Sequence, residues 1–139
     1  MSNRVRVLIG VLVAAAAVGV AVSAAATQQT VTAAWSVVDH CTSGWCAGNN
    51  YTGTWTIVQK KGSHTLSGHD NAGNKLTGTI TGARATWTLK GASYSFVVHA
   101  TFAANGKSFA GTFTDSKHAS GTTHGTRPGG GGTRTVTLP

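Results

Sequence analysis

The sequence contains no glutamate, and its 139 residues include only three carboxylate side chains, Asp39, Asp70 and Asp115. A helix-rich globular protein is hard to build without glutamate, which is among the better helix formers. After residue 26 no segment repeats apolar residues at the i, i+3, i+4 spacing of an amphipathic helix, and apolar and polar residues alternate instead. Both absences favour an all-β fold.

The scarcity of acidic residues also bears on catalysis. Glycosidases use paired carboxylates, whereas the three aspartates lie in separate predicted loops. The neighbours Asp39 and His40 would point to opposite faces of a strand, as would His69 and Asp70, so neither pair forms a dyad. The chain has no Gly-x-Ser-x-Gly elbow and no phosphate-cradling loop. The sequence therefore offers no catalytic residue, and an enzyme ranks third, after the two binding hypotheses given at the end of this subsection.

The histidines do not predict a metal site, although there are six of them. His118 and His124 share one face of a predicted strand, but six residues at about 3.3 Å each would place them ~20 Å apart. A site built across neighbouring strands stays open, yet no ligand spacing supports it. Neither a metal nor another cofactor is expected.

Only two cysteines are present, Cys41 and Cys46, with four residues between them. This spacing is not the C-x-x-C of redox proteins, and only His40 lies close enough to join a metal site. The export signal described in the next paragraph predicts that the chain leaves the cytoplasm, and in an oxidising compartment such a pair is expected to form a disulfide. The sequence predicts a structural disulfide that closes a tight loop.

The first 26 residues have the layout of an export signal. Arg4 and Arg6 form a basic start, residues 7–22 are apolar and uncharged, and cleavage is expected after Ala24 or Ala26. We therefore expect a secreted or otherwise extracytoplasmic protein. An uncleaved N-terminal membrane anchor is the alternative, because the apolar run approaches the ~20 residues that span a bilayer.

Turn signals every eight to twelve residues divide the rest of the chain, as in a β-sandwich or barrel. An extended segment over 30–38 and the cysteine loop form an expected N-terminal extension, 27–50, before a barrel domain over 51–139. Short connections favour nearest-neighbour hairpins. We predict an antiparallel meander barrel, with a two-sheet sandwich as the alternative. The predicted strands are 53–59, 64–70, 75–81, 85–90, 94–102, 108–114, 118–126 and 133–138, the last being a flexible tail in the alternative interpretation.

Apolar side chains and glycines share the inner face of these predicted strands. The units 51–55, 76–80 and 109–113 each have apolar ends around a central glycine. Inward glycines let a small sheet coil tightly, and they leave either ligand space or room for large side chains to interdigitate. The candidate ligand-binding residues are the inward aromatic ones: Trp55, Trp87, Tyr94, Phe96 and Phe113.

Gly53-Thr54-Trp55 opens the run of predicted strands, and Arg127 or Arg134 lies near its end. This arrangement resembles the calycin group, the lipocalins and avidin-like proteins, in which an arginine from the last strand covers the tryptophan of a Gly-x-Trp on the first. The resemblance implies a cation–π contact over Trp55 and an eight-stranded barrel able to hold one small apolar ligand. The chain lacks the pocket tryptophans of the avidin pattern, and it is shorter than many lipocalins.

The formal net charge is +8, and most basic residues fall at predicted turns. Such spreading suits solvated loop tips and is unlike the clustered footprint of a nucleic-acid-binding protein. The leading hypothesis is a secreted, non-enzymatic protein that binds a small apolar or amphipathic ligand inside the barrel. The alternative is an adhesion module for a cell wall or surface polymer with no internal ligand, using the basic loops and an exposed Trp45.

Overall fold

The computed structural model describes residues 27–28, 30–128 and 134–135, and the predicted signal over 1–26 lies outside these ranges. Within them, no helix has the length and apolar character that crossing a bilayer requires.

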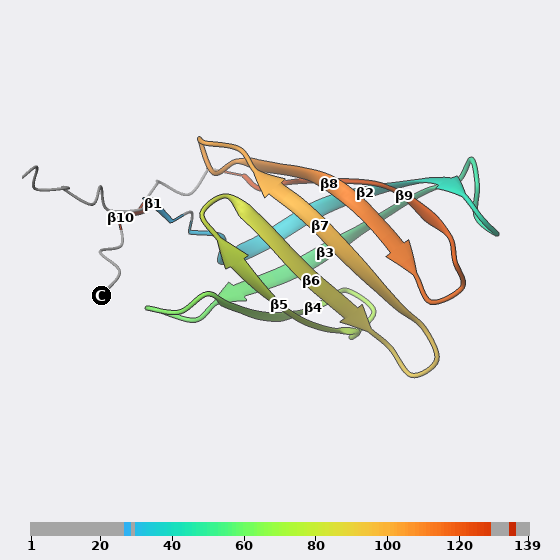
Figure 1. Ribbon diagram of the computed structural model, residues 1–139, viewed down its shortest axis with the longest axis horizontal. Coiled ribbons are helices and arrows are strands. Elements are labelled where there is room, and N and C mark those ends of the chain that lie inside the picture. Colours follow the sequence, from blue (N-terminus) through green and yellow to red (C-terminus); the bar gives the residue numbers. More distant parts are fainter. Residues whose placement is uncertain (1–26, 29, 129–133, 136–139) are drawn as a thin grey trace, which may run out of the picture.

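Eight antiparallel strands close into a barrel (Figure 1). Each strand pairs with its neighbour in sequence, and the last pairs with the first. The predicted all-β meander barrel is confirmed, and the sandwich alternative is wrong. Closure leaves no free edge in this sheet. The strands are β2 (Ala33–Ser43), β3 (Asn50–Gln59), β4 (Thr65–Asp70), β5 (Lys75–Thr81), β6 (Arg84–Lys90), β7 (Ser95–Phe102), β8 (Ser108–Asp115) and β9 (Ser120–Thr126).

The first barrel strand differs from the sequence prediction. Strand β2, expected to belong to an extension outside the barrel, pairs with both β3 and β9. Its alternate residues Trp35, Val37 and Cys41 are buried in the core, which is the pattern of a barrel strand. The barrel therefore begins at Ala33 and not at residue 51.

Of the predicted last strand, 133–138, the two residues that the structure describes lie outside the barrel. Its described residues form β10 (Arg134–Thr135), which pairs with β1 (Thr27–Gln28) in a separate two-stranded sheet. The rest of that predicted strand lies outside the described residues. Strand β9 takes the closing position instead, because it can pair with β2.

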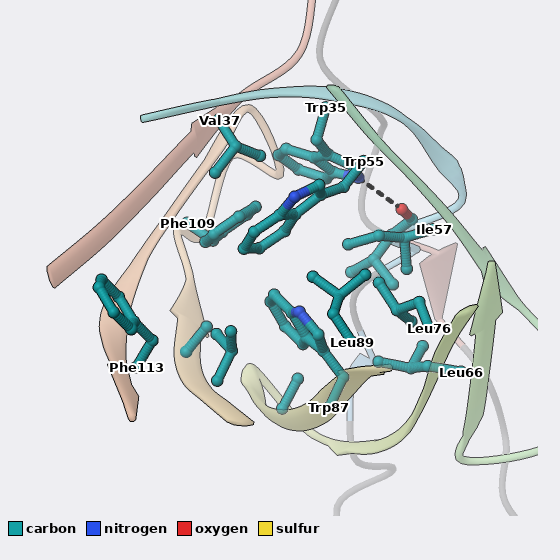
Figure 2. Packing of buried hydrophobic residues seen from close by; sticks show 14 of the residues in the cluster. Trp35, Val37, Trp55, Ile57, Leu66, Leu76, Trp87, Leu89, Phe109 and Phe113 are labelled. Atoms are coloured by element: carbon teal, nitrogen blue, oxygen red, sulfur yellow. Dashed lines mark hydrogen bonds between the residues drawn. The ribbon is translucent and has the colours of Figure 1, made fainter. Parts of the chain in front are cut away.

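Aromatic side chains fill much of the barrel interior (Figure 2). Phe109 is the hub of this core, because its ring contacts those of Trp35, Trp55, Trp87 and Phe102 at centroid distances of 5.3, 6.1, 5.4 and 5.4 Å. Each such pair adds roughly 0.5–1.5 kcal/mol to the hydrophobic gain of burying the rings. At this depth the barrel is a packed core.

Gly125 shows why glycines line this interior. It pairs with Phe109 across β8 and β9, and a Cβ atom at residue 125 would overlap the Phe109 ring. Gly121 similarly faces Phe113. A ring that lies flat over a bare backbone both fills space and lets the strand bend. Here the inward glycine makes room for a neighbouring side chain.

One end of the barrel is closed by Arg127, which follows β9. Its guanidinium carbon lies 4.8 Å from the centroid of the Trp35 ring, and its three nitrogens donate to backbone carbonyls at 2.7, 3.3 and 2.7 Å. Burial lowers the pKa of Arg127. The tryptophan under the arginine is thus Trp35 and not the expected Trp55, because β2 is the first barrel strand. The carbonyls belong to Gly106, Thr32 and Thr30.

Candidate functional site

The other end of the barrel holds a cavity of about 390 Å³, here called the mouth cavity. Phe96 and Phe113 line it at the side of the packed core, with ring centroids 5.8 Å apart. Tyr51, Tyr94 and Trp45 add aromatic surface. The aromatic core therefore stops short of this end, and a concave apolar space begins where it stops.

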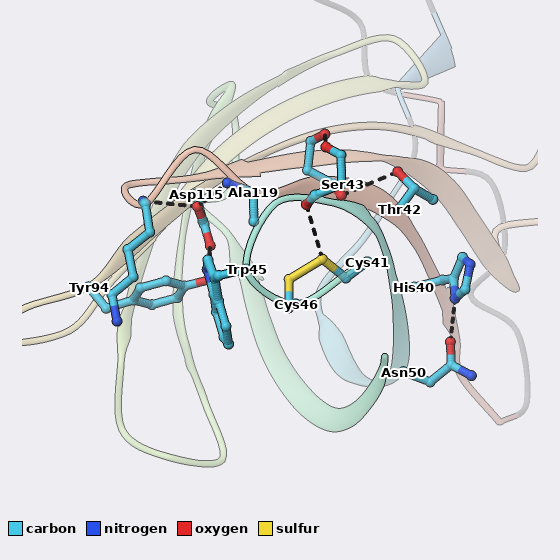
Figure 3. The surroundings of a disulfide bond; sticks show 12 residues. His40, Cys41, Thr42, Ser43, Trp45, Cys46, Asn50, Tyr94, Asp115 and Ala119 are labelled. Atoms are coloured by element: carbon cyan, nitrogen blue, oxygen red, sulfur yellow. Dashed lines mark hydrogen bonds between the residues drawn. A yellow bond between two sulfur atoms is a disulfide. The ribbon is translucent and has the colours of Figure 1, made fainter. Parts of the chain in front are cut away.

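Figure 3 shows the disulfide loop, and two of its residues, Trp45 and Cys46, line the mouth cavity at its rim. Cys41 and Cys46 are bonded as predicted, with Cα atoms 5.7 Å apart. The Gly48 N–H donates to the Cys41 carbonyl at 2.8 Å, which tightens the loop. Gly44 has a φ of +89°, and a Cβ there would lie 2.6 Å from the Cα of Ala119. Only glycine lets the loop pack this closely on the β8–β9 turn.

Asp115 fixes two aromatic side chains of the rim. The Trp45 indole N–H donates to its Oδ2 at 2.8 Å, and the Tyr94 hydroxyl donates to the same oxygen at 3.0 Å. Oδ1 accepts the backbone N–H groups of Lys117 and Ala119 at 2.9 and 2.7 Å. Burial opposes ionisation, but these hydrogen bonds outweigh it and lower the pKa of Asp115. The carboxylate is therefore a charged clamp that orients Trp45 and Tyr94.

Tyr94 keeps its proton in this arrangement. Burial, followed by the hydrogen bond to Asp115 and the charge of that carboxylate, raises the pKa of Tyr94. The hydroxyl is thus a fixed donor, and the ring presents an uncharged face to the cavity.

Asp39 is a half-buried carboxyl group in the wall of the mouth cavity. Its Oδ1 is buried and accepts no hydrogen bond from the described residues. Burial raises the pKa of Asp39 from 3.8 to about 6, and the facing hydroxyl of Thr123 offsets only part of the rise. The side chain can therefore change charge near neutral pH.

The topology brings all three carboxylates of this basic chain to one end. Asp39 and Asp70 line the mouth cavity, and Asp115 holds its rim. Asp70 is satisfied by its own turn, because its oxygens accept Ala72 N–H, Asn74 N–H and the Asn74 amide at 2.7–2.9 Å. The prediction that the three aspartates lie in separate loops is wrong, because they belong to β2, β4 and β8. They converge in space, although none of them forms a catalytic pair with another in the described contacts.

The structure separates the five predicted ligand-binding residues into two groups. Tyr94, Phe96 and Phe113 line the mouth cavity. Trp55 and Trp87 lie deeper in the packed core and do not line it, although the Trp55 ring is 5.7 Å from that of Phe96. Both tryptophan rings pack against Phe109 in the core and are therefore not part of the cavity wall.

Sequence reasoning missed other residues of the cavity wall, above all Asp39 and Tyr51. Tyr51 stands opposite Asp39 in the β2–β3 ladder, so identifying β2 as a barrel strand would have placed both. Trp45 was expected only as an exposed aromatic residue. It is 56% exposed, yet it also forms part of the cavity wall.

Among the described residues, no group of three histidine, cysteine or acidic side chains could hold a metal ion. The mouth cavity presents aromatic faces, the carboxyl groups of Asp39 and Asp70, and one amine. That amine is Lys117, whose Nζ lies 5.5 Å from the Trp45 ring centroid and 5.9 Å from that of Tyr94.

No protein-family model matches this chain, and no curated protein sequence matches it. Among solved structures, it is similar to a redesigned beta barrel, mFAP1, bound to DFHBI, with a TM-score of 0.50 and 17% sequence identity. The match covers 70% of this chain and 95% of that one. The likeness shows the fold alone. It agrees with a small closed barrel of eight strands.

Proposed function

We propose that this protein binds a small amphipathic ligand in the mouth cavity and catalyses no reaction. The observation that carries the proposal is the cavity itself, about 390 Å³ with Phe96 and Phe113 beneath and aromatic side chains around it. Ligand sites in proteins are concave spaces of roughly 300–1,000 Å³, lined mostly by apolar groups with a few placed polar ones.

The eight-stranded barrel fold also supports binding of a small ligand. Eight-stranded barrels are either filled by side chains or hold one small ligand. This barrel is filled from Arg127 to the Trp55 level, so the ligand would sit at the mouth and not in the middle. The similar barrel mFAP1 was solved with the small molecule DFHBI bound. The arginine over Trp35 also agrees with the calycin resemblance, with a different tryptophan from the one expected.

We further propose that the protein works outside the cytoplasm. The layout of residues 1–26 supports export. A disulfide in the loop over the cavity also suits an oxidising compartment, where such a bond persists. Appearance of the processed protein in the culture medium would support this proposal, and retention of the full-length chain in the membrane would support the anchor alternative.

Ligand binding is tested with N-phenyl-1-naphthylamine, a neutral probe whose emission rises in apolar sites. We expect saturable binding, about fivefold weaker in Tyr51→Ala, because an aromatic contact contributes on the order of 1 kcal/mol. The matched control is Val58→Ala, since both residues lie on β3 and both are 42% exposed. Failure of the wild-type protein to bind this probe, together with a panel of charged aromatic compounds, would reject the function.

A surface-polymer adhesion module is the competing proposal, favoured by the exposed Trp45 and its neighbour Tyr51, 6.5 Å away between ring centroids. Retention on insoluble anionic wall polymer that disappears at high salt would support it.

A further inference from the structure

We propose that the mouth cavity selects ligands that carry a protonated amine, with the ammonium group bound at the Asp39 carboxylate and the apolar body against Phe96 and Phe113. This inference rests on the proposed function and specifies the class of its ligand.

The first argument is that Asp39 is not held by its own turn. Asp70 and Asp115 are both occupied by hydrogen bonds from their own turns and from the rim. The half-buried Asp39 side chain lines the cavity, and its Oδ1 is buried on the side of the Thr123 hydroxyl. A ligand donor that reaches this carboxylate would form a charge-assisted hydrogen bond, so the wall favours ligands with N–H or O–H groups.

The second argument is that aromatic faces lie around the same space. Trp45, Tyr51 and Tyr94 all line the cavity with Asp39. Ring faces attract cations, and the attraction is strongest where water is displaced. A carboxylate together with several ring faces therefore suits an organic ammonium group better than a neutral alcohol, which gains from the hydrogen bond alone.

The third argument is that an ammonium group already lies at the rim. The exposed Lys117 places its Nζ 5.5 Å from the Trp45 ring centroid and 5.9 Å from that of Tyr94. The rings at this end thus hold an amine of the chain itself. A ligand amine would compete with Lys117 for Trp45 and Tyr94, so removing the lysine charge should strengthen amine binding.

Binding should depend on pH, because Asp39 attracts a cation only when ionised. Burial raises the pKa of Asp39 to about 6, so the protonated form dominates at pH 5 and the carboxylate at pH 7.5. The charged and titratable groups around it are Tyr51 on β3, Asp70 on β4, Tyr94 before β7, and Asp115 and Lys117 at the β8–β9 turn. None of the raised or lowered pKa values among these falls between pH 5 and 7.5.

The test compares three probes with the same ring system, 1-naphthylmethylamine, 1-naphthylmethanol and 1-naphthoate, by calorimetric titration of the wild-type protein. We expect the amine to bind about tenfold more tightly than the alcohol at pH 7.5, as a charge-assisted hydrogen bond should allow. That preference should be lost at pH 5. Asp39→Asn should remove the preference at both pH values, and Lys117→Gln should increase it.

The outcomes separate the two proposals. Equal binding of amine and alcohol would overturn the amine selectivity and leave the binding function standing. Tighter binding of the naphthoate, lost in Lys117→Gln, would reassign the cavity to anions and overturn the inference. Binding of none of the three probes would reject the binding function itself. The wild-type comparison decides the question even where Asp39→Asn fails to fold.

Discussion

Arg127 covers the ring of Trp35 at 4.8 Å and closes the barrel end that lies away from the mouth cavity. The Trp35 indole N–H donates to the carbonyl of Val31 at 2.9 Å. The tryptophan is thus fixed by a hydrogen bond as well as by the contact of its ring with Arg127. The same guanidinium reaches the carbonyls of Thr30 and Thr32, which precede β2. Arg127 thereby ties the chain before the first barrel strand to the end of the last.

Replacing Arg127 by alanine should destabilise the protein by about 1–3 kcal/mol, because the cation–π contact and the charged hydrogen bonds are lost together. Urea unfolding followed by tryptophan fluorescence measures the change. Arg84→Ala is the control, since Arg84 is exposed on β6, and it should change the unfolding free energy by less than about 0.5 kcal/mol. Equal effects of the two substitutions would contradict a sealing role for Arg127.

Asp39 should make the protein less stable as the pH rises from about 4 to about 6. Its pKa is raised from 3.8 to about 6 in the folded state, so in this range the folded protein binds more protons than the unfolded chain, and stability falls with pH. The loss should be about 1–3 kcal/mol, and it should be complete only after the pH has risen well past the folded-state pKa of about 6. The difference between the unfolding free energies of the wild type and Asp39→Asn, measured across pH 3–8, isolates this contribution. A difference that does not vary with pH would refute it.

Asp115 should make the protein more stable as the pH rises, and its effect should fall at lower pH than that of Asp39. Its pKa is lowered by the hydrogen bonds it accepts, so its contribution to stability is present above the ordinary aspartate pKa of ~3.9 and disappears as the pH falls through the lower, folded-state value. At pH 7, Asp115→Ala should lose about 2–4 kcal/mol and shift the Trp45 emission towards that of free indole in water. For the unfolding free energy, Lys117→Ala is the matched control, because it keeps the backbone N–H group that donates to Asp115.

Gly125→Ala should destabilise the barrel by about 1–3 kcal/mol, because the added methyl group overlaps the Phe109 ring. A double-mutant cycle with Phe109→Leu tests the cause. The smaller side chain should relieve the overlap, so the double variant should be more stable than the sum of the two single losses predicts. Strict additivity would show that Gly125 is required for a reason unrelated to Phe109.

Alternation of apolar residues was sufficient to predict the barrel and strands β3 to β9, but not which segment closes it. Strand β2 carries Asp39 at an inward position, which interrupts its apolar face, whereas the Thr135-Val136-Thr137-Leu138 pattern looked regular. Closure depends on pairing between β2 and β9, from opposite ends of the chain. A local pattern contains no information on that pairing.

The mouth cavity was only partly predictable for a similar reason. Inward alternation was enough to select Tyr94, Phe96 and Phe113, which do line it. It could not separate them from Trp55 and Trp87, since depth along a barrel depends on register. Nor could it place Trp45 there, because that position depends on a hydrogen bond to a residue 70 positions away in the chain.

The seam between β2 and β9 sets the order in which this chain can fold. It joins Ser36 to Thr126, whereas every other ladder of the barrel links strands that are adjacent in the chain. Hairpins from β2 to β8 can form one after another, but loop-closure entropy makes the seam the slowest contact. Until Thr126 has been synthesised, the nascent sheet has two open edges.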